Sequence, residues 1–178
     1  LKSDYLSLII IGNGPILKDC FDFCNDRGLT YEFNSKLFNI KRDIYFTGHI
    51  ENPLSIIQKC RFFVMPSFHE GLSNQLLEAV YAGIPIIATN CHGNKFIYKE
   101  IAKENREYIN SHFLKLLPII KNSRIKSIWA KELIYYSENI KGNKYKNSNK
   151  LIENFSSDNN FIKWESTVRN ILNKKEIR

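Results

Sequence analysis

Residues 62–93 contain the pattern that most constrains the fold: an apolar run, a polar loop, a helical segment, a tight turn and a second apolar run. Residues 62–65 are typical of a buried strand. Ser73 precedes NQLLEAVYA at the position of a helix N-cap, and Gly83 follows it as a helix stop. Pro85 then opens a second apolar strand, PIIAT. The pattern therefore predicts a strand, a loop, a helix and a second strand in succession.

The predicted helix has one apolar face, and Glu78 falls off that face, beside Ala79 and Ala82. A helix with one apolar stripe usually turns that stripe toward the core. We therefore expect five side chains of this segment to be packed inside the protein, namely Leu76, Leu77, Val80, Tyr81 and Ile84.

The loop before this helix has the chemistry of an anion-binding site. Free backbone N–H groups and the partial positive charge of a helix N-terminus suit phosphate. Gly71 lets the backbone approach a ligand closely. Glu70 and Glu78 could each accept hydrogen bonds from the vicinal hydroxyls of a sugar or a ribose. The alternative is two solvated carboxylates, which are favourable near a helix start without any ligand.

The segment resembles one family signature in three features. These are the run Pro-Ser-x-x-Glu-Gly, the seven residues between Glu70 and Glu78, and the run Glu-Ala-x-x-x-Gly-x-Pro-Ile-Ile-Ala-Thr. The signature is that of the family 4-type, retaining glycosyltransferases with the GT-B fold, where it lies in the C-terminal, donor-binding domain. The resemblance implies that Glu70 is the catalytic contact to the donor sugar and that Glu78 binds the ribose hydroxyls. It also implies that the backbone of Gly71, Leu72 and Ser73 meets the diphosphate and the sugar.

The same resemblance implies an α/β fold with a Rossmann-like parallel sheet flanked by helices, the C-terminal half of a GT-B enzyme. The residues themselves predict a helix-rich C-terminal third. We expect a nucleotide-sugar-binding core over residues 1–96, and a helix-rich extension over residues 97–178 that packs on the same domain. Residues 97–140 are predicted to be helical with an interruption at Pro118. Relatives place a Gly-Leu-Leu-Val strand here and a Glu where this chain has Phe96.

The N-terminal part predicts a further strand and helix. Residues 6–11 are a continuous apolar, β-branched run, typical of a strand covered on both faces. Gly12 and Gly14 follow it and resemble the Gly-x-Gly-Pro turn of the family. We interpret both glycines as mainly conformational, with a donor contact as a second option. A helix is predicted after them, ending at Gly28.

Residues 29–43 are mixed and polar, and we predict no element there. A short strand is predicted over residues 44–46 and a helix over residues 53–60. In relatives, the backbone after the glycine of this segment meets the nucleotide base, which implies a base contact at Ile50 with Asn52 nearby. The alternative is that Ile50 is a core residue and Asn52 a helix cap.

Cysteine and histidine patterns give no further site. The four cysteines show no disulfide framework and no second pair of ligands, so we interpret them as reduced thiols rather than metal ligands. That favours a reducing, cytoplasmic compartment. The sequence has no Asp-x-Asp, so we expect no metal. His69 and His92 flank the expected site, but no base partner is visible and we assign neither a proton-transfer role.

The net charge is unevenly distributed. Residues 1–92 carry 8 Lys and Arg against 9 Asp and Glu, a net charge of −1. Residues 93–178 carry 18 against 9, a net charge of +9. The basic half is either an ordinary solvated surface or a peripheral contact to anionic lipid at the inner face of the membrane. We find no nucleic-acid-binding module, and no apolar run reaches the roughly 18 residues of a membrane span.

The resemblance therefore implies the donor domain of a retaining glycosyltransferase, inactive without a second Rossmann-like domain upstream that supplies the acceptor half and a basic pair for the diphosphate. The expected donor is a nucleoside diphosphate sugar, a UDP-sugar by family frequency, and no cofactor is expected. The expected transfer moves a hexose or N-acetylhexosamine to a glycan or lipid-linked acceptor in polysaccharide biosynthesis. Two alternatives stay open: a non-catalytic nucleotide-sugar-binding module that needs a partner subunit, and a sugar-nucleotide epimerase of the same fold.

Overall fold

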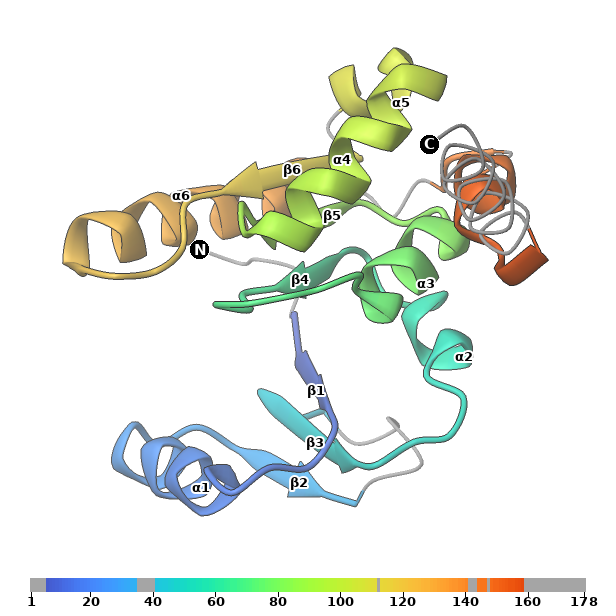
Figure 1. The fold of residues 1–178 in the computed structure, drawn as a ribbon. Coiled ribbons are helices and arrows are strands. Elements are labelled where there is room, and N and C mark those ends of the chain that lie inside the picture. The colour runs from blue at the N-terminus through green and yellow to red at the C-terminus, as the bar shows by residue number, and fades with distance from the viewer. Residues whose placement is uncertain (1–5, 35–40, 112, 141–143, 147, 159–178) are drawn as a thin grey trace, which may run out of the picture. The chain divides into compact units, whose positions relative to one another are not determined.

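The computed structural model describes residues 6–34, 41–111, 113–140, 144–146 and 148–158. The chain divides into two compact units, residues 1–55 and 56–178, which are described separately below (Figure 1). Every pairing between the named strands is parallel, so the predicted parallel α/β class is confirmed, with the strands forming two three-stranded sheets. The predicted division at residue 96 remains a prediction.

The first unit is a parallel sheet with strand order β1-β3-β2 and a helix packed on it. Aromatic side chains hold the helix in place, because the Phe21 ring stacks on Tyr31 at 5.0 Å and meets Phe46 edge-on at 5.0 Å. Cys24 of the same helix is 1% exposed. The strand at residues 31–33 was not predicted. The elements are β1 (Leu8–Ile11), α1 (Leu17–Asp26), β2 (Tyr31–Phe33) and β3 (Ile44–Gly48).

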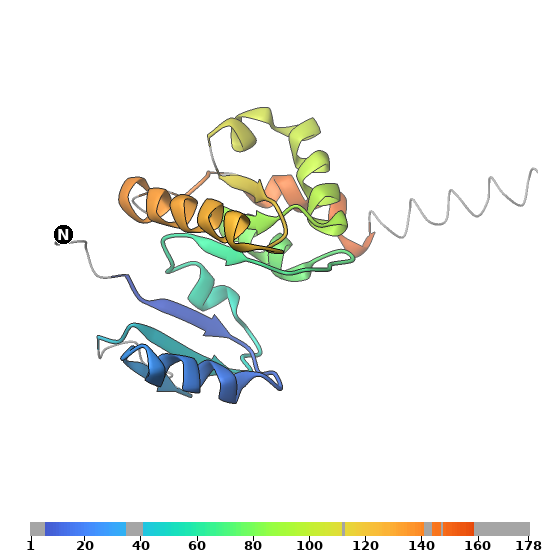
Figure 2. The same cartoon turned by 90° about the vertical axis from the view of Figure 1, so that its left-hand side faces the viewer.

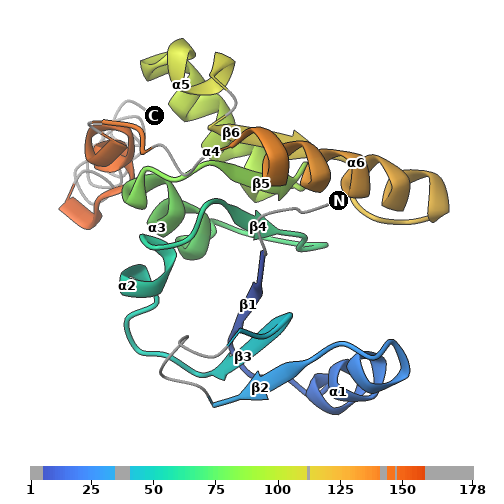
Figure 3. The ribbon, with the colours of Figure 1, turned by 180° about the vertical axis from the view of Figure 1, so that it is seen from behind.

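The second unit is a parallel sheet of order β4-β5-β6 with helices on both faces. In Figure 1, α4 lies in front of this sheet, whereas α6 lies in front of it in Figure 3. The strands are β4 (Phe63–Met65), β5 (Ile86–Thr89) and β6 (Leu114–Leu117). The helices are α3 (Asn74–Ala82), α4 (His92–Glu104), α5 (Arg106–Asn110), α6 (Ser123–Asn139) and the 3-10 helix η1 (Ser148–Phe155). The short α2 (Leu54–Ile57) spans the boundary between the units.

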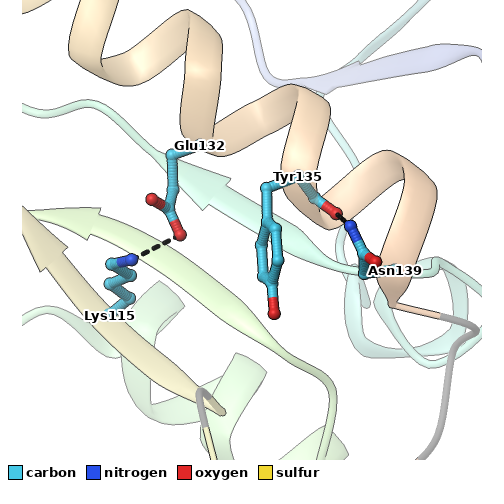
Figure 4. A network of polar contacts seen from close by, with 4 residues as sticks. All are labelled: Lys115, Glu132, Tyr135 and Asn139. Atoms are coloured by element: carbon cyan, nitrogen blue, oxygen red, sulfur yellow. Dashed lines mark hydrogen bonds and ion pairs between the residues drawn. The ribbon is translucent and has the colours of Figure 1, made fainter.

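The α6 side of the second sheet has an apolar core. Alternate strand residues point to the same face, so Ile87 and Leu117 lie together, and they form a cluster with Trp129 and Tyr136 of α6. A polar contact runs at the same interface, since Lys115 of β6 donates to Glu132 of α6 at 2.6 Å (Figure 4). The helix and its strand are therefore joined by both apolar and charged contacts, and Figure 2 shows α6 lying along the sheet.

The end of α6 is fixed by an arginine from far earlier in the sequence. Arg61, just before β4, donates through one guanidinium nitrogen to the carbonyls of Ser137 and Ile140, each at 2.9 Å. Its Nε donates to Ile140 at 3.2 Å. Carbonyls in the last turn of a helix have no partner inside the helix, and a cation is favourable beside them.

The prediction of helix over residues 97–140 is wrong at Leu114–Leu117, which form β6. The apolar spacing of FLKLL fits a short strand as well as a helix. Pairing decides the outcome, because Leu114 to Leu117 align with Ile86 to Thr89 along the free edge of β5. A strand with the sequence LKLL is therefore present in the segment that was predicted to be helical.

Other expectations are corrected in detail. The position of His92 directly after the apolar run PIIATN predicts a loop, but helix α4 begins at His92, which therefore lies in a first helical turn. The helix predicted over residues 53–60 is limited to Leu54–Ile57. The basic, Asn-rich composition of residues 141–150 predicts a loop, but residues 148–150 belong to η1. The sequence also predicts a closing helix over FSSDNNFIKWESTVRNILNKK, residues 155–175, most of which lies outside the described residues.

Three observations on side chains and helices complete the fold. All four cysteines are free thiols. Burial raises the pKa of the Cys24 and Cys60 thiols above the ordinary value. Among the residues that the structure describes, no helix combines the length and the apolar character needed to cross a membrane.

Candidate functional site

Helix α3 begins and ends where the sequence predicts. Ser73 is its N-cap, and the Ser73 hydroxyl accepts a hydrogen bond from the Leu76 N–H at 3.3 Å. Gly83 is its C-cap, with φ 68°, in the left-handed region that favours glycine. Because Ser73 is 1% exposed and its side chain caps the helix, only its backbone is suited to meet a ligand.

Three of the five side chains predicted to be packed inside the protein, Leu76, Val80 and Ile84, are 0% exposed, and Leu77 is half-buried. Ala79 and Ala82 are buried, whereas Tyr81, predicted to be a core residue, is 44% exposed. The buried side of α3 thus combines these two alanines with Leu76 and Val80, and Tyr81 is the predicted core residue that the structure leaves exposed. Glu78 consequently lies on the outer face of the helix, which it shares with Asn74, Leu77 and Tyr81.

One oxygen of the Glu78 carboxylate is buried without a partner. Glu78 Oε2 is shielded from solvent and makes no hydrogen bond with any described residue. A buried acceptor without a donor is costly, so Glu78 Oε2 requires a donor that the other described residues do not supply. Beside it is an open hollow of about 260 Å³, lined by Asn74, Leu77, Glu78, Tyr81 and Ile152.

The loop of residues 67–72, which carries Glu70, is held by a buried polar relay. The Thr89 hydroxyl at the end of β5 donates to the Ser67 carbonyl at 2.5 Å. The Asn94 amide in turn donates to the Thr89 carbonyl at 3.0 Å. Thr89 and Asn94 are both 0% exposed. Buried polar groups that are fully hydrogen-bonded favour a single arrangement of the backbone around them. The relay therefore fixes the position at which the loop leaves the sheet.

The first turn of α4 lies directly against the same loop. A Cβ atom at Gly93 would be 1.6 Å from the Gly71 carbonyl oxygen and 2.7 Å from that of Glu70. Only glycine allows this approach. The N-termini of α3 and α4 therefore both adjoin the loop of residues 67–72, and each contributes partial positive charge there.

Sequence reasoning did not find these positioning residues. None of Thr89, Gly93 and Asn94 was singled out from the sequence. A signal for Asn94 was available, since Asn94 directly follows Gly93 at the start of a helix. A buried polar side chain at such a position must find a hydrogen-bond partner. Of the predicted site residues in this unit, the structure places Glu70 half-buried and Gly71 and Leu72 exposed.

The predicted site residues of the first unit lie at the carboxyl ends of its strands. The Gly12 N–H donates to the Gly48 carbonyl at 2.8 Å, and φ is 123° at Gly12 and 68° at Gly48, so both positions require glycine. Gly14 is exposed and has a normal φ, so its conformation does not require glycine. Ile50 is half-buried, Asn52 is exposed, and the donor roles of all four predicted residues remain predictions.

The aromatic side chain in place of the expected Glu has a partner of its own. Phe96 is 51% exposed, and its ring meets Phe155 edge-on with 6.3 Å between the centroids. His69 and His92 are both exposed. Within the described residues, no group of three or more His, Cys, Asp or Glu is placed to hold a metal ion.

Parallel strands whose carboxyl ends carry glycine turns and helix N-termini define the class of α/β proteins that bind nucleotides at that edge of the sheet. Residues 1–111 match the family described as glycosyl transferases group 1, and the chain belongs to that family.

Three similar proteins illustrate the relationship. The chain is 31% identical over 84 residues to an uncharacterized glycosyltransferase of Methanocaldococcus jannaschii, covering 47% of this chain and 18% of the relative. It is 29% identical over 91 residues to the UDP-Gal:alpha-D-GlcNAc-diphosphoundecaprenol alpha-1,3-galactosyltransferase of Escherichia coli, covering 51% and 21%. The C-terminal CMP-Kdo binding domain of WaaA from Acinetobacter baumannii superposes with a TM-score of 0.48 at 12% identity, over 84% of this chain and 91% of that domain. The chain thus spans about a fifth of the two full-length relatives.

Proposed function

We propose that this chain is the donor-binding part of a retaining glycosyltransferase and that it binds a nucleoside diphosphate sugar, a UDP-sugar in our first choice. The observation that carries the proposal is the buried, unpartnered Glu78 Oε2 beside an open hollow. A ribose offers two neighbouring hydroxyl donors, and a carboxylate can accept both. Family membership supports this assignment of the carboxylate.

The loop of residues 67–72 suits the diphosphate and the sugar. Its backbone lies beside the N-termini of α3 and α4, whose partial positive charge favours an anion. Glu70 is half-buried on this loop and would accept hydrogen bonds from the sugar hydroxyls. The polar relay through Thr89 and Asn94 keeps the loop in one position, which is what orientation of a reacting group requires.

The proposed reaction moves a hexose or N-acetylhexosamine with retention. The bond between the sugar C1 and the diphosphate oxygen breaks, and a bond from C1 to an acceptor hydroxyl oxygen forms on the same face. The hydroxyl proton passes to the departing phosphate, so neither Glu70 nor Glu78 needs to act as an acid or a base. Charge on the departing diphosphate is stabilised by the two helix N-termini.

The acceptor and the remaining basic groups are proposed to come from outside these 178 residues. The chain spans only about a fifth of its full-length relatives, one of which is named for a diphosphoundecaprenol-linked acceptor. We propose a glycan or lipid-linked acceptor and a second, N-terminal Rossmann-like domain. The net charge of +9 on residues 93–178 is consistent with a peripheral contact to anionic lipid, from the cytoplasmic side.

Glu78→Ala tests the nucleotide site. We expect the substitution to weaken UDP binding by about 1.5–3 kcal/mol, the range for a hydrogen bond to a charged group. The measurement is a ligand-detected NMR titration with UDP, GDP and ADP, on the protein and on the variant. Glu138→Ala, which removes an exposed carboxylate from α6, is the matched control and should leave binding unchanged. Equal UDP binding by Glu78→Ala and the unsubstituted protein would refute the assignment.

Glu70→Ala tests the division of roles between the two carboxylates. If Glu70 contacts the sugar, the variant should bind the free nucleoside diphosphate normally and the nucleotide sugar more weakly, by about 1.5–3 kcal/mol. The same titration, run in parallel with UDP and with UDP-sugars, measures both affinities. A loss of the same size for both ligands would contradict a separate sugar contact.

A further inference from the structure

Residues 144–146 and 148–156, here called the C-terminal strap, are anchored firmly on α3 and α5. The Tyr145 N–H donates to the Gly83 carbonyl at 2.7 Å. The Asn105 amide donates to the Tyr145 hydroxyl at 2.6 Å. The Tyr145 ring meets Tyr108 edge-on, with 4.8 Å between the centroids. The strap therefore starts from a fixed point at the C-terminal end of α3.

The strap then runs beside α3 as the 3-10 helix η1, as Figure 1 shows. The Ser148 hydroxyl donates to the Tyr81 carbonyl at 2.9 Å, and Leu151 is 5% exposed. The fit depends on Gly83, because a Cβ atom there would lie 2.7 Å from the Tyr145 carbonyl oxygen. Side chains three residues apart share a face of a 3-10 helix, so Ser148 and Leu151 together form the anchored side.

This placement brings Ile152 to the hollow of Glu78. Ile152 is the single residue from outside α3 that lines the hollow among the described residues, and it is half-buried. Leu77 and Tyr81 are the apolar lining from α3 itself. The hollow thus combines one carboxylate with an apolar surface built from two elements. A nucleoside has the matching chemistry, since its hydroxyls are on one edge and its ring faces are apolar.

We propose that the C-terminal strap forms one wall of the nucleotide site and that Ile152 contacts the bound nucleoside. The inference rests on the proposed function, because it takes the Glu78 hollow as the place of the ribose. Glu78 accepts the ribose hydroxyls, and Ile152 covers the apolar side of the same nucleoside. The strap begins about 60 residues after the match to the family signature, so it adds a contact that the signature itself does not contain.

Isoleucine methyl NMR tests the contact directly. With UDP as the probe, the Ile152 methyl signal should shift on titration, whereas the signal of Ile128, which is 40% exposed on α6, should not. Ile152→Ala should weaken UDP binding by about 10-fold, the lower end of the range for a lost apolar contact in a binding pocket. Lys150→Ala, at an exposed position of the same strap, is the matched control and should bind UDP normally.

The outcomes separate this inference from the proposed function. If UDP binds, Glu78→Ala loses it, and the Ile152 signal shifts, the wall is supported. If UDP binds and Glu78→Ala loses it, but the Ile152 signal stays in place, the wall is overturned and the donor site stands. If the protein binds no nucleoside diphosphate, both are overturned. The methyl measurement on the unsubstituted protein decides the matter even if Ile152→Ala fails to fold.

Discussion

Gly93→Val should lower donor affinity and kcat/KM by more than about 100-fold, because a displacement of roughly 1 Å at a reacting group can cost that much. A Cβ atom at this position would lie 1.6 Å from the Gly71 carbonyl oxygen, so the loop that carries Glu70 must move. The neighbouring atoms are backbone and cannot turn aside as the end of a side chain would. The measurements are UDP-sugar titration of this chain and steady-state kinetics of the complete enzyme.

A second glycine substitution is the control for the Gly93 variant. Gly28 ends α1 with φ 63°, so Gly28→Ala strains the backbone at a cost of about 1–2 kcal/mol but meets no atom within 4 Å. We expect this variant to lose stability and keep its donor affinity. If Gly93→Val also kept its donor affinity and only its melting temperature fell, α4 would not be setting the position of the loop.

Trp129→Ala should lower the free energy of unfolding by about 3–5 kcal/mol, the range for deleting a large buried aromatic side chain. Trp129 is 3% exposed and packs with Ile87 and Leu117, which belong to β5 and β6. Its indole N–H also donates to the Pro118 carbonyl at 2.8 Å, directly after β6. The substitution removes contacts of α6 with both strands, and chemical denaturation measures the loss.

The adjacent residue on α6 provides the comparison for Trp129. Ile128 is 40% exposed, so Ile128→Ala should change the free energy of unfolding by only about 0.5 kcal/mol. A small effect at both positions would mean that α6 is not packed on β5 and β6. A large effect at Trp129 alone supports the sheet that includes β6, the strand that the sequence interpretation missed.

Local signals predicted helix α3, whereas pairing at a distance decided strand β6. Ser73 and Gly83 fix the ends of α3 through their own backbone and side-chain chemistry, so the predicted bounds agree with the observed ones. The segment Leu114–Leu117 has no such signal, and its alignment with Ile86–Thr89 depends on residues almost 30 positions earlier. The three-residue β2 was missed for the same reason, since it is defined by its partner β3.

The residues of the candidate site also divide into those that a local sequence signal predicts and those that only tertiary contacts place. Its chemistry is local in sequence, so Glu70, Gly71 and Glu78 could be proposed from their spacing on one loop and one helix. The residues that hold the loop in position could not be proposed in this way. Thr89 and Asn94 act through tertiary hydrogen bonds across the end of the sheet. On α3, the prediction holds at Leu76 and Val80, which are 0% exposed, and is wrong at Tyr81, which is 44% exposed.

The arginine that fixes the end of α6 has a consequence for biosynthesis. Arg61 reaches the Ile140 carbonyl across 79 positions of sequence. Contacts of such separation form late, because the intervening chain must be ordered before they are made. We expect the last turn of α6 to reach Arg61 late in translation, after the chain between them has been synthesised. The second unit should appear on the ribosome as one late cooperative step, which pulse proteolysis of stalled nascent chains of increasing length would detect.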